Sequence, residues 1–475
     1  MSRLNNYNIF RAALWYTVGN ILIRGISFFT LPVFTALMDT HDYGIYSVYT
    51  SYLSILETVI LFGLSSTISM AKFSDDLDYD AYLSAALVIP PMLSLAGGVG
   101  VAFYLGAFEQ LFSMDATLWT FLLINAAATA VSSIVQAKLI LDGRYQVYIL
   151  YSALYTFLNL GLSLVLCYTV YRSHDMYMAR VVGNCVASVL AALGILPLSR
   201  IRVSLQRKCF QKAFRWGLPL LFHTLATVLL TQTDRILIQR IEGFSTAGIY
   251  SVAVTITVIP LTLLTSLNSA WNPWLLDQLE QKNYPLIRTV NHQYLLLFTV
   301  IIGEMMLISP EIIHIFADEA YWESIYSLIP LLLSVFGEML YSLPVSVEYY
   351  HKKTSYIMTG TLLCLVCNVV LDIIMIFSFG YIAAAYATAI SKLLLFFFHA
   401  VLARKLDKNP IFEKRYALLA MLLLILLNLL VTTQVDQLLL RLGLFVLVGV
   451  LFLGWIWKNR RILLASFLHK PSQSP

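Results

Sequence analysis

The sequence predicts an all-α integral membrane protein with about fourteen transmembrane helices. Of its 475 residues, 59% are hydrophobic and 12% are charged, whereas a soluble domain is nearer a quarter charged. Apolar segments recur along nearly the whole length, and each is long enough to cross a hydrocarbon core of roughly 30 Å as a helix. A short internal repeat also divides the chain into two halves, which is typical of transporters.

The apolar segments give approximate bounds for the predicted helices. They lie at 12–37, 44–71, 82–106, 115–138, 146–170, 177–199, 215–239, 247–275, 288–308, 325–349, 355–378, 381–403, 413–433 and 437–457. Most of the 31 Lys and Arg residues fall between them on the side that holds both termini. Because flanking cations favour the cytoplasmic side, both termini are predicted to be cytoplasmic. The net charge of +5 is then a topology signal and does not indicate a nucleic-acid partner.

The repeat is the pentapeptide GIYSV, which occurs at 44–48 and again at 248–252. Each copy follows one long apolar segment and opens another, so we infer a duplication. The predicted organisation is an N-terminal six-helix lobe at 1–200, a basic cytoplasmic linker at 201–212, and a C-terminal six-helix lobe at 213–405. Two extra helices and a cytoplasmic tail occupy 406–475. Two such lobes predict a transporter with its substrate site between them.

The sequence contains no pattern that indicates an enzyme. Every predicted loop is short, the longest on the outside being about 309–324. The metalloprotease, nucleophile-elbow and nucleotide-binding motifs are absent from the sequence, so we expect no catalytic residue, no cofactor and no metal site. The C-x-x-C at Cys364 and Cys367 lies inside an apolar segment without a second metal-binding pair, which favours a packing role.

Ionisable residues inside the spans are the candidates for function, because such groups normally face a cavity or each other. Asn20 and Arg24 belong to a polar stripe on the first helix, and Glu57 lies at matching depth on the second. We expect Arg24 and Glu57 to form an ion pair or to face each other across a cavity. A structural role and a role in binding or coupling both stay open.

The C-terminal half has further charges inside its spans. Asp372 and Lys392 lie on either side of a turn near Gly380, at depths that differ by roughly 6 Å, which a lysine stem can bridge. Glu338 has no evident partner in the sequence and is a candidate proton carrier, with a hydrogen-bonded structural acid as the alternative. Glu348 lies close to a span end, where we expect it to be solvated.

The seventh span repeats the polar stripe of the first. His223, Thr227, Thr231 and Asp234 follow at helical spacing. His223 is a candidate substrate contact, with a packing role as the alternative. Asp234 and Arg235 lie near the outer end of this span. We expect Asp234 to continue the stripe and the pair to form an outer gate or lobe-locking contact, with simple anchoring to headgroups as the alternative.

Three segments carry a resemblance to a known family. The segment WGLPLLFHTLATVLLTQTDRILIQRIEGFSTAGIYSVA at 216–253 resembles the seventh-helix signature of Wzx-type polysaccharide and O-antigen flippases. LPVFTALMDTHDYGIYSVYTSYLSI at 31–55 and SLNSAWNPWL at 266–275 are similar to other parts of that family. Ala36 and Phe222 depart from its usual basic residue and proline.

The resemblance implies the multidrug/oligosaccharidyl-lipid/polysaccharide (MOP) exporter superfamily and a V-shaped two-lobe bundle in the bacterial inner membrane. It implies that the protein flips undecaprenyl-pyrophosphate-linked glycans of lipopolysaccharide or capsule biosynthesis by alternating access. The partners it implies are membrane lipid and the polymerase and chain-length proteins of the same pathway. Arg24 is then best placed for the pyrophosphate, because a guanidinium donates bidentate hydrogen bonds to phosphate. Tyr341 is a candidate for stacking on sugar rings.

Other functions stay open at this stage. A cation-coupled multidrug antiporter and a lipid II flippase would share the same two lobes. A membrane glycan polymerase or acyltransferase is disfavoured by the duplication and the short loops.

Overall fold

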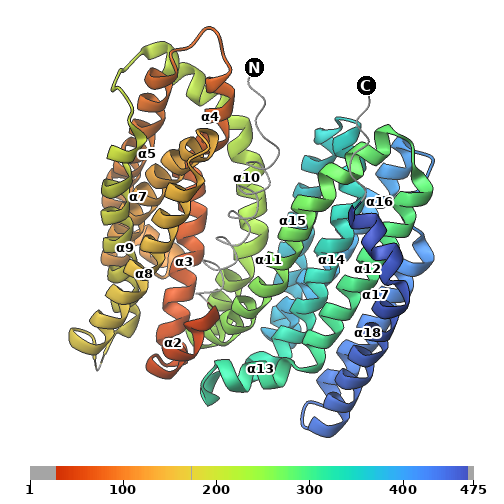
Figure 1. Cartoon of the computed structure of the whole chain (residues 1–475). Helices are drawn as coiled ribbons and strands as arrows, with labels where there is room; N and C mark the ends of the chain where they lie inside the picture. Colours follow the sequence, from red (N-terminus) through yellow and green to blue (C-terminus); the bar gives the residue numbers. More distant parts are fainter. Residues whose placement is uncertain (1–27, 173, 469–475) are drawn as a thin grey trace. The chain divides into compact units, whose positions relative to one another are not determined.

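The computed structural model describes residues 28–172 and 174–468, which form α-helices joined by short turns (Figure 1). Thirteen helices in this part of the chain are long and apolar enough to cross a membrane. The predicted first helix, 12–37, lies mostly outside the described residues. The predicted all-α, multi-pass membrane fold is confirmed.

The helices follow the predicted segments closely. They are α2 (Leu31–Leu37), α3 (Thr40–Leu61), α4 (Leu64–Lys72), α5 (Tyr79–Phe103), α6 (Leu105–Phe112), α7 (Ala116–Leu141), α8 (Tyr145–Thr169), α9 (Met176–Ile195), η1 (Pro197–Ser199), α10 (Arg207–Glu242), α11 (Phe244–Glu280), α12 (Tyr284–Leu307), α13 (Ser309–Phe316), η2 (Glu319–Ser324), α14 (Ile325–Tyr350), α15 (Thr354–Phe379), α16 (Ile382–Leu406), α17 (Lys414–Thr433) and α18 (Leu438–Leu468).

Aspartates at the helix starts explain several of these boundaries. The side chain of Asp39 accepts a hydrogen bond from the backbone of α3, and Asp78 and Asp115 do the same for α5 and α7. Each carboxylate satisfies a backbone N–H that has no partner within its own helix.

The predicted helix at 44–71 is interrupted in the structure. Phe62 and Gly63 both have positive φ and separate α3 from α4. Gly63 lies against α10, where an added Cβ would come within 2.9 Å of the carbonyl oxygen of Gly217. The close approach of α10 therefore requires glycine at the break.

The basic linker predicted at 201–212 is partly helical, because α10 begins at Arg207. Cys209 is buried in a core cluster with residues of α4, α5 and α7. Lys208 and Lys212, on the other face of the same turns, form ion pairs with Asp76. This amphipathic pattern adds two turns to the helix before its apolar part begins.

The chain divides into two compact units, Met1–Ser251 and Val252–Pro475. In the first unit, α7 packs against α3, α5 and α9. In the second, α14 packs against α12, α15, α16 and α17 and is the most buried of the membrane spans. The predicted lobe boundaries at 200 and 213 stay a prediction, since the compact units follow contacts and not the repeat.

Candidate functional site

The two copies of the GIYSV repeat contact each other, one at the start of α3 and the other at the start of α11. A Cβ atom on Gly44 would overlap the carbonyl oxygen of Phe244, and one on Gly248 would overlap the carbonyl oxygen of Thr40. Thr40 precedes Gly44 by as many residues as Phe244 precedes Gly248. The contact is therefore self-complementary, and its glycines allow the two backbones to meet.

Serines of the two copies continue this contact. The hydroxyl groups of Ser47 and Ser251 share a hydrogen bond, and both side chains are buried. The two serines are 204 residues apart, which is also the offset between the two copies. A local two-fold relation thus holds for both the glycines and the serines.

The tyrosines of the two copies have different partners. Tyr250 donates a hydrogen bond to Oδ2 of Asp234 on α10 at 2.8 Å. Tyr46 instead lies against the guanidinium of Arg180 on α9, with 3.9 Å from Cζ to the ring centroid. The symmetry is thus restricted to the backbone and serine contact.

Arg235 connects α10 to the same region. Its Nη1 donates to Oγ of Ser51 on α3 at 3.5 Å and to Oε1 of Gln232 at 3.3 Å. Asp234 is only 7% exposed. The predicted Asp234 and Arg235 pair is therefore held by helices α3 and α11, and its gating role stays a prediction.

The predicted polar stripe on α10 is shorter than expected. His223, Thr227 and Thr231 are exposed, and Thr227 donates to the backbone oxygen of His223 at 3.2 Å. Asp234 does not continue the exposed stripe, because it is buried against Tyr250. His223 is thus accessible for a ligand, and its role as a substrate contact stays a prediction.

Glu57 faces α7. Its Oε1 accepts a hydrogen bond from Oγ of Ser133 at 3.3 Å. Arg24, its predicted partner, and Asn20 lie outside the described residues. The relation between Arg24 and Glu57 stays a prediction.

Lys392 and Glu338 form an ion pair between α16 and α14, with 2.6 Å from Nζ to Oε2. The expectation that Glu338 lacks a partner is therefore wrong. The helices approach closely here, since a Cβ on Gly337 would lie 2.9 Å from Cβ of Lys392. Asp372 on α15 is fully buried, and its pairing with Lys392 stays a prediction.

Glu348 and His399 form a second buried pair between α14 and α16. Their side chains have no exposed surface, and Nδ1 lies 2.8 Å from Oε1. The expectation that Glu348 is solvated is wrong, because α15 covers the pair at Gly360, where a Cβ would overlap the imidazole ring. Tyr341 packs edge-on against His399 at 5.1 Å, and its contact with sugar stays a prediction.

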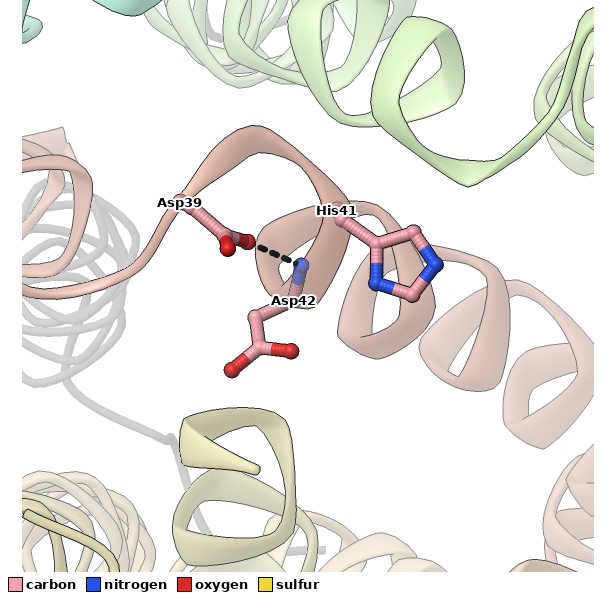
Figure 2. Close-up of side chains that lie close together, drawn as sticks. All are labelled: Asp39, His41 and Asp42. Atoms are coloured by element: carbon pink, nitrogen blue, oxygen red, sulfur yellow. Dashed lines mark hydrogen bonds between the residues drawn. The ribbon is translucent and has the colours of Figure 1, made fainter. Parts of the chain in front are cut away.

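Three side chains at the start of α3 lie close together, as Figure 2 shows: Asp39, His41 and Asp42. Their potential ligand atoms lie within 4.8 Å of one another. However, Asp39 accepts from the backbone N–H of Asp42, and Asp42 accepts from that of Met176 at the start of α9, each at 2.7 Å. Helix capping accounts for both carboxylates, so we assign no metal site here.

An apolar groove of about 740 Å³ lies along α5, α7 and α9 in the first unit. Its polar side chains are Ser94 and Thr120, and the Oγ of Ser94 already donates to the backbone of Leu123. A sugar or pyrophosphate headgroup requires polar partners, so this groove does not fit one.

The sequence indicates most of the residues in these contacts but not their partners. The repeat was visible, but sequence spacing does not reveal that Ser47 and Ser251 face each other. The sequence pattern did not single out His399. Its imidazole lies inside an apolar segment, and this position indicates a buried partner because buried polar groups need hydrogen-bond partners.

Comparisons with known proteins agree with this architecture. The model of a family described as "Polysaccharide biosynthesis protein" matches residues 9–278. An uncharacterized membrane protein of Haemophilus influenzae is 24% identical over 353 residues, which cover 72% of this chain and 84% of the relative.

Two solved structures are similar over most of their length. The lipid II flippase MurJ in an inward closed conformation has a TM-score of 0.73 at 17% identity, covering 95% of this chain and 99% of that one. An inward-facing multidrug resistance MATE family transporter of the MOP superfamily has a TM-score of 0.61 at 14% identity, covering 84% and 96%. At these identities the likeness shows the fold.

Proposed function

Because the chain belongs to the polysaccharide biosynthesis protein family and has the fold of MOP superfamily transporters, we propose that it is a flippase for lipid-linked oligosaccharides. Its substrate is an undecaprenyl-pyrophosphate-linked polysaccharide repeat unit. The protein moves this unit from the cytoplasmic to the periplasmic leaflet by alternating access.

The self-complementary contact of Gly44 and Ser47 with Gly248 and Ser251 carries this proposal. Alternating access needs two repeated elements that meet on one side of the substrate and separate later. By the distribution of Lys and Arg, the contact lies at the outer ends of α3 and α11. It closes the outer side while the headgroup enters from the cytoplasm, and Asp234 and Arg235 support it.

The substrate contacts follow from residue chemistry. Arg24 binds the pyrophosphate through bidentate hydrogen bonds, and Asn20 lies one turn away on the same predicted face. His223 and Tyr341 contact the glycan. Glu57, Glu338, Asp372 and Lys392 are the candidates for ion coupling or for charge pairs that hold the helices.

The cellular setting follows from this substrate. The protein acts in the bacterial inner membrane with both termini in the cytoplasm. Its product enters a pathway with a polymerase and a chain-length partner.

Complementation tests the proposal. A strain that lacks its own flippase and makes one defined lipid-linked glycan should regain surface polysaccharide when it expresses the wild-type chain. The Arg24→Ala variant should not restore it, whereas Lys353→Met, at an exposed loop position, should. Accumulation of the lipid-linked intermediate despite normal expression of the wild-type chain counts against this substrate.

Two further strains separate the alternatives. A cation-coupled multidrug antiporter would export fluorescent dyes from cells that lack their main exporters. A lipid II flippase would restore growth to cells depleted of their own. The shared fold keeps both as candidates.

A further inference from the structure

A cavity in the second unit has features that the flipping proposal does not use. The segment after α12, which the sequence presents as its longest outside loop, folds into α13 and η2. Together with the start of α14, the turn before α18 and the start of α18, these elements line an open cavity of about 480 Å³. Ligand pockets typically have volumes of about 300–1,000 Å³.

Arg441 holds one wall of the cavity in place. Its Nη1 and Nη2 donate to the two carboxylate oxygens of Glu311 at 2.7 Å each, and Nη1 also donates to the backbone oxygen of Leu307 at 2.9 Å. Partial burial raises the pKa of the Glu311 carboxyl, but the hydrogen bonds from Arg441 outweigh burial, so the pKa is lowered. The bidentate geometry fixes α18 against α13 and gives the cavity a rigid base.

Aromatic side chains form another wall. Trp322 lies 4.3 Å from the ring of His314, between centroids, and its Nε1 donates to the backbone oxygen of Ala317 at 3.3 Å. Trp322 is 38% exposed and Tyr326 is 36% exposed. Because the indole N–H is already used, Trp322 offers the cavity a carbon surface in a fixed orientation.

The charges of the cavity define the ligand chemistry. Three carboxylates line it, from Glu311, Glu323 and Asp436, against the single guanidinium of Arg441. Asp436 and Glu323 are exposed. The excess of acceptors favours a ligand with many hydroxyl donors and repels carboxylates and phosphates. An open cavity with mixed polarity is poorly suited to an apolar drug, which needs most of its surface buried.

We propose that this cavity binds a neutral pyranose ring, with one face of the sugar on Trp322 and its hydroxyl groups on Asp436 and Glu323. The segments that form the cavity lie on the side of the membrane where few Lys and Arg residues occur between spans. This is the expected outer side. The cavity is thus a second glycan site, built by elements of the second unit. This inference rests in part on the proposed function, because it is the flipped glycan that supplies the sugar.

Binding to the full-length protein in lipid nanodiscs tests the site. The probes are methyl N-acetyl-β-glucosaminide as the neutral sugar, methyl β-glucuronide as the acidic one, and tetraphenylphosphonium as an apolar cation. We expect saturable binding of the neutral sugar by saturation-transfer NMR, weakened by about tenfold in Trp322→Ala and in Asp436→Asn. Trp457→Ala, which removes another exposed tryptophan outside the cavity, should bind as the wild type does.

Asp436→Asn keeps the test valid if Trp322→Ala fails to fold, because Asp436 is exposed and lies in a turn. Equal binding of the glucuronide, or displacement of the sugar by tetraphenylphosphonium, would overturn the inference. So would a wild-type chain that complements the flippase-deficient strain but binds no neutral sugar, a result that leaves the proposed function intact. Sugar binding that depends on Trp322 and Asp436 in a chain that fails to complement supports the site and counts only against the proposed function.

Discussion

Ser47 and Ser251 share one hydrogen bond, and the 204 residues between them equal the offset between the two copies of GIYSV. Their neighbours Gly44 and Gly248 exchange equivalent backbone contacts. Because each contact on one copy has its counterpart on the other, a small separation of α3 from α11 breaks them together. A contact that breaks as one unit is suited to the gate proposed above.

Crosslinking the two serines should lock this contact. We expect Ser47→Cys/Ser251→Cys to form a disulfide under mild oxidation, because the two hydroxyl oxygens are in direct hydrogen-bond contact. Flipping in reconstituted vesicles should then stop, and a reductant should restore it. Each single cysteine variant, treated with the same oxidant, is the control for the five native cysteines. A crosslinked double variant that flips at the wild-type rate would exclude a gate at this contact.

Alanine at either repeat glycine should disturb the same contact to a similar extent. In both Gly44→Ala and Gly248→Ala, the new methyl group meets a backbone carbonyl that cannot easily shift. We expect each to lower stability by about 1–3 kcal/mol in thermal or denaturant unfolding. Gly194→Ala on α9, where a Cβ meets nothing within 4 Å, is the matched control and should be neutral or stabilising. A large effect at one repeat glycine and none at the other would argue against a symmetric contact.

The fold was largely predictable because a bilayer limits the choices. Spans such as α8 and α17 contain long uninterrupted apolar runs, and their ends agree with the predicted bounds to within a few residues. The predicted helix at 44–71 was wrong in one respect, since the break at Phe62 and Gly63 depends on α10 crossing nearby. That crossing is a tertiary contact and leaves no local periodicity in the sequence.

The candidate site was less predictable, because helical depth gives a residue's height in the membrane but not the direction of its side chain. Depth in the sequence pointed to Asp372 as a partner of Lys392, and the structure shows an ion pair of Lys392 with Glu338 on α14. Glu348 lies near a span end, yet the packing of α15 across His399 buries it completely. Partner choice depends on which helices are neighbours, and that is set by the whole bundle.

The Lys392 and Glu338 pair should behave as a coupled unit. The two side chains are 15% and 32% exposed, so removing one charge should cost about 1–3 kcal/mol, less than the roughly 3–5 kcal/mol typical of fully buried pairs. We expect Glu338→Gln and Lys392→Met each to lower unfolding stability, and the double variant to recover part of the loss. The exposed Lys353→Met should have no effect. Strict additivity of the two single changes would show that the pair carries no coupling energy.

A second cluster predicts how stability depends on pH. Asp142, in the turn after α7, forms ion pairs with Lys72 of α4 at 2.8 Å and with Lys138 of α7 at 2.5 Å. Partial burial raises the pKa of Asp142, but the hydrogen bonds from Lys138 and Lys72 outweigh it, and the folded pKa is lowered. The contribution is therefore complete above the unfolded pKa of about 3.9 and is lost as the pH falls through the folded value.

We therefore expect Asp142→Asn to be less stable than the wild type by about 0.5–1 kcal/mol at pH 7, a modest amount because the pair is partly exposed. The difference should shrink below about pH 4, since the wild-type carboxylate is then protonated and resembles the amide. Unfolding in detergent across this pH range measures it, and Asp75→Asn, an exposed aspartate in the loop after α4, is the control. A stability difference that is the same at pH 7 and at pH 3 would mean that Asp142 holds α4 and α7 together by packing and not by its charge.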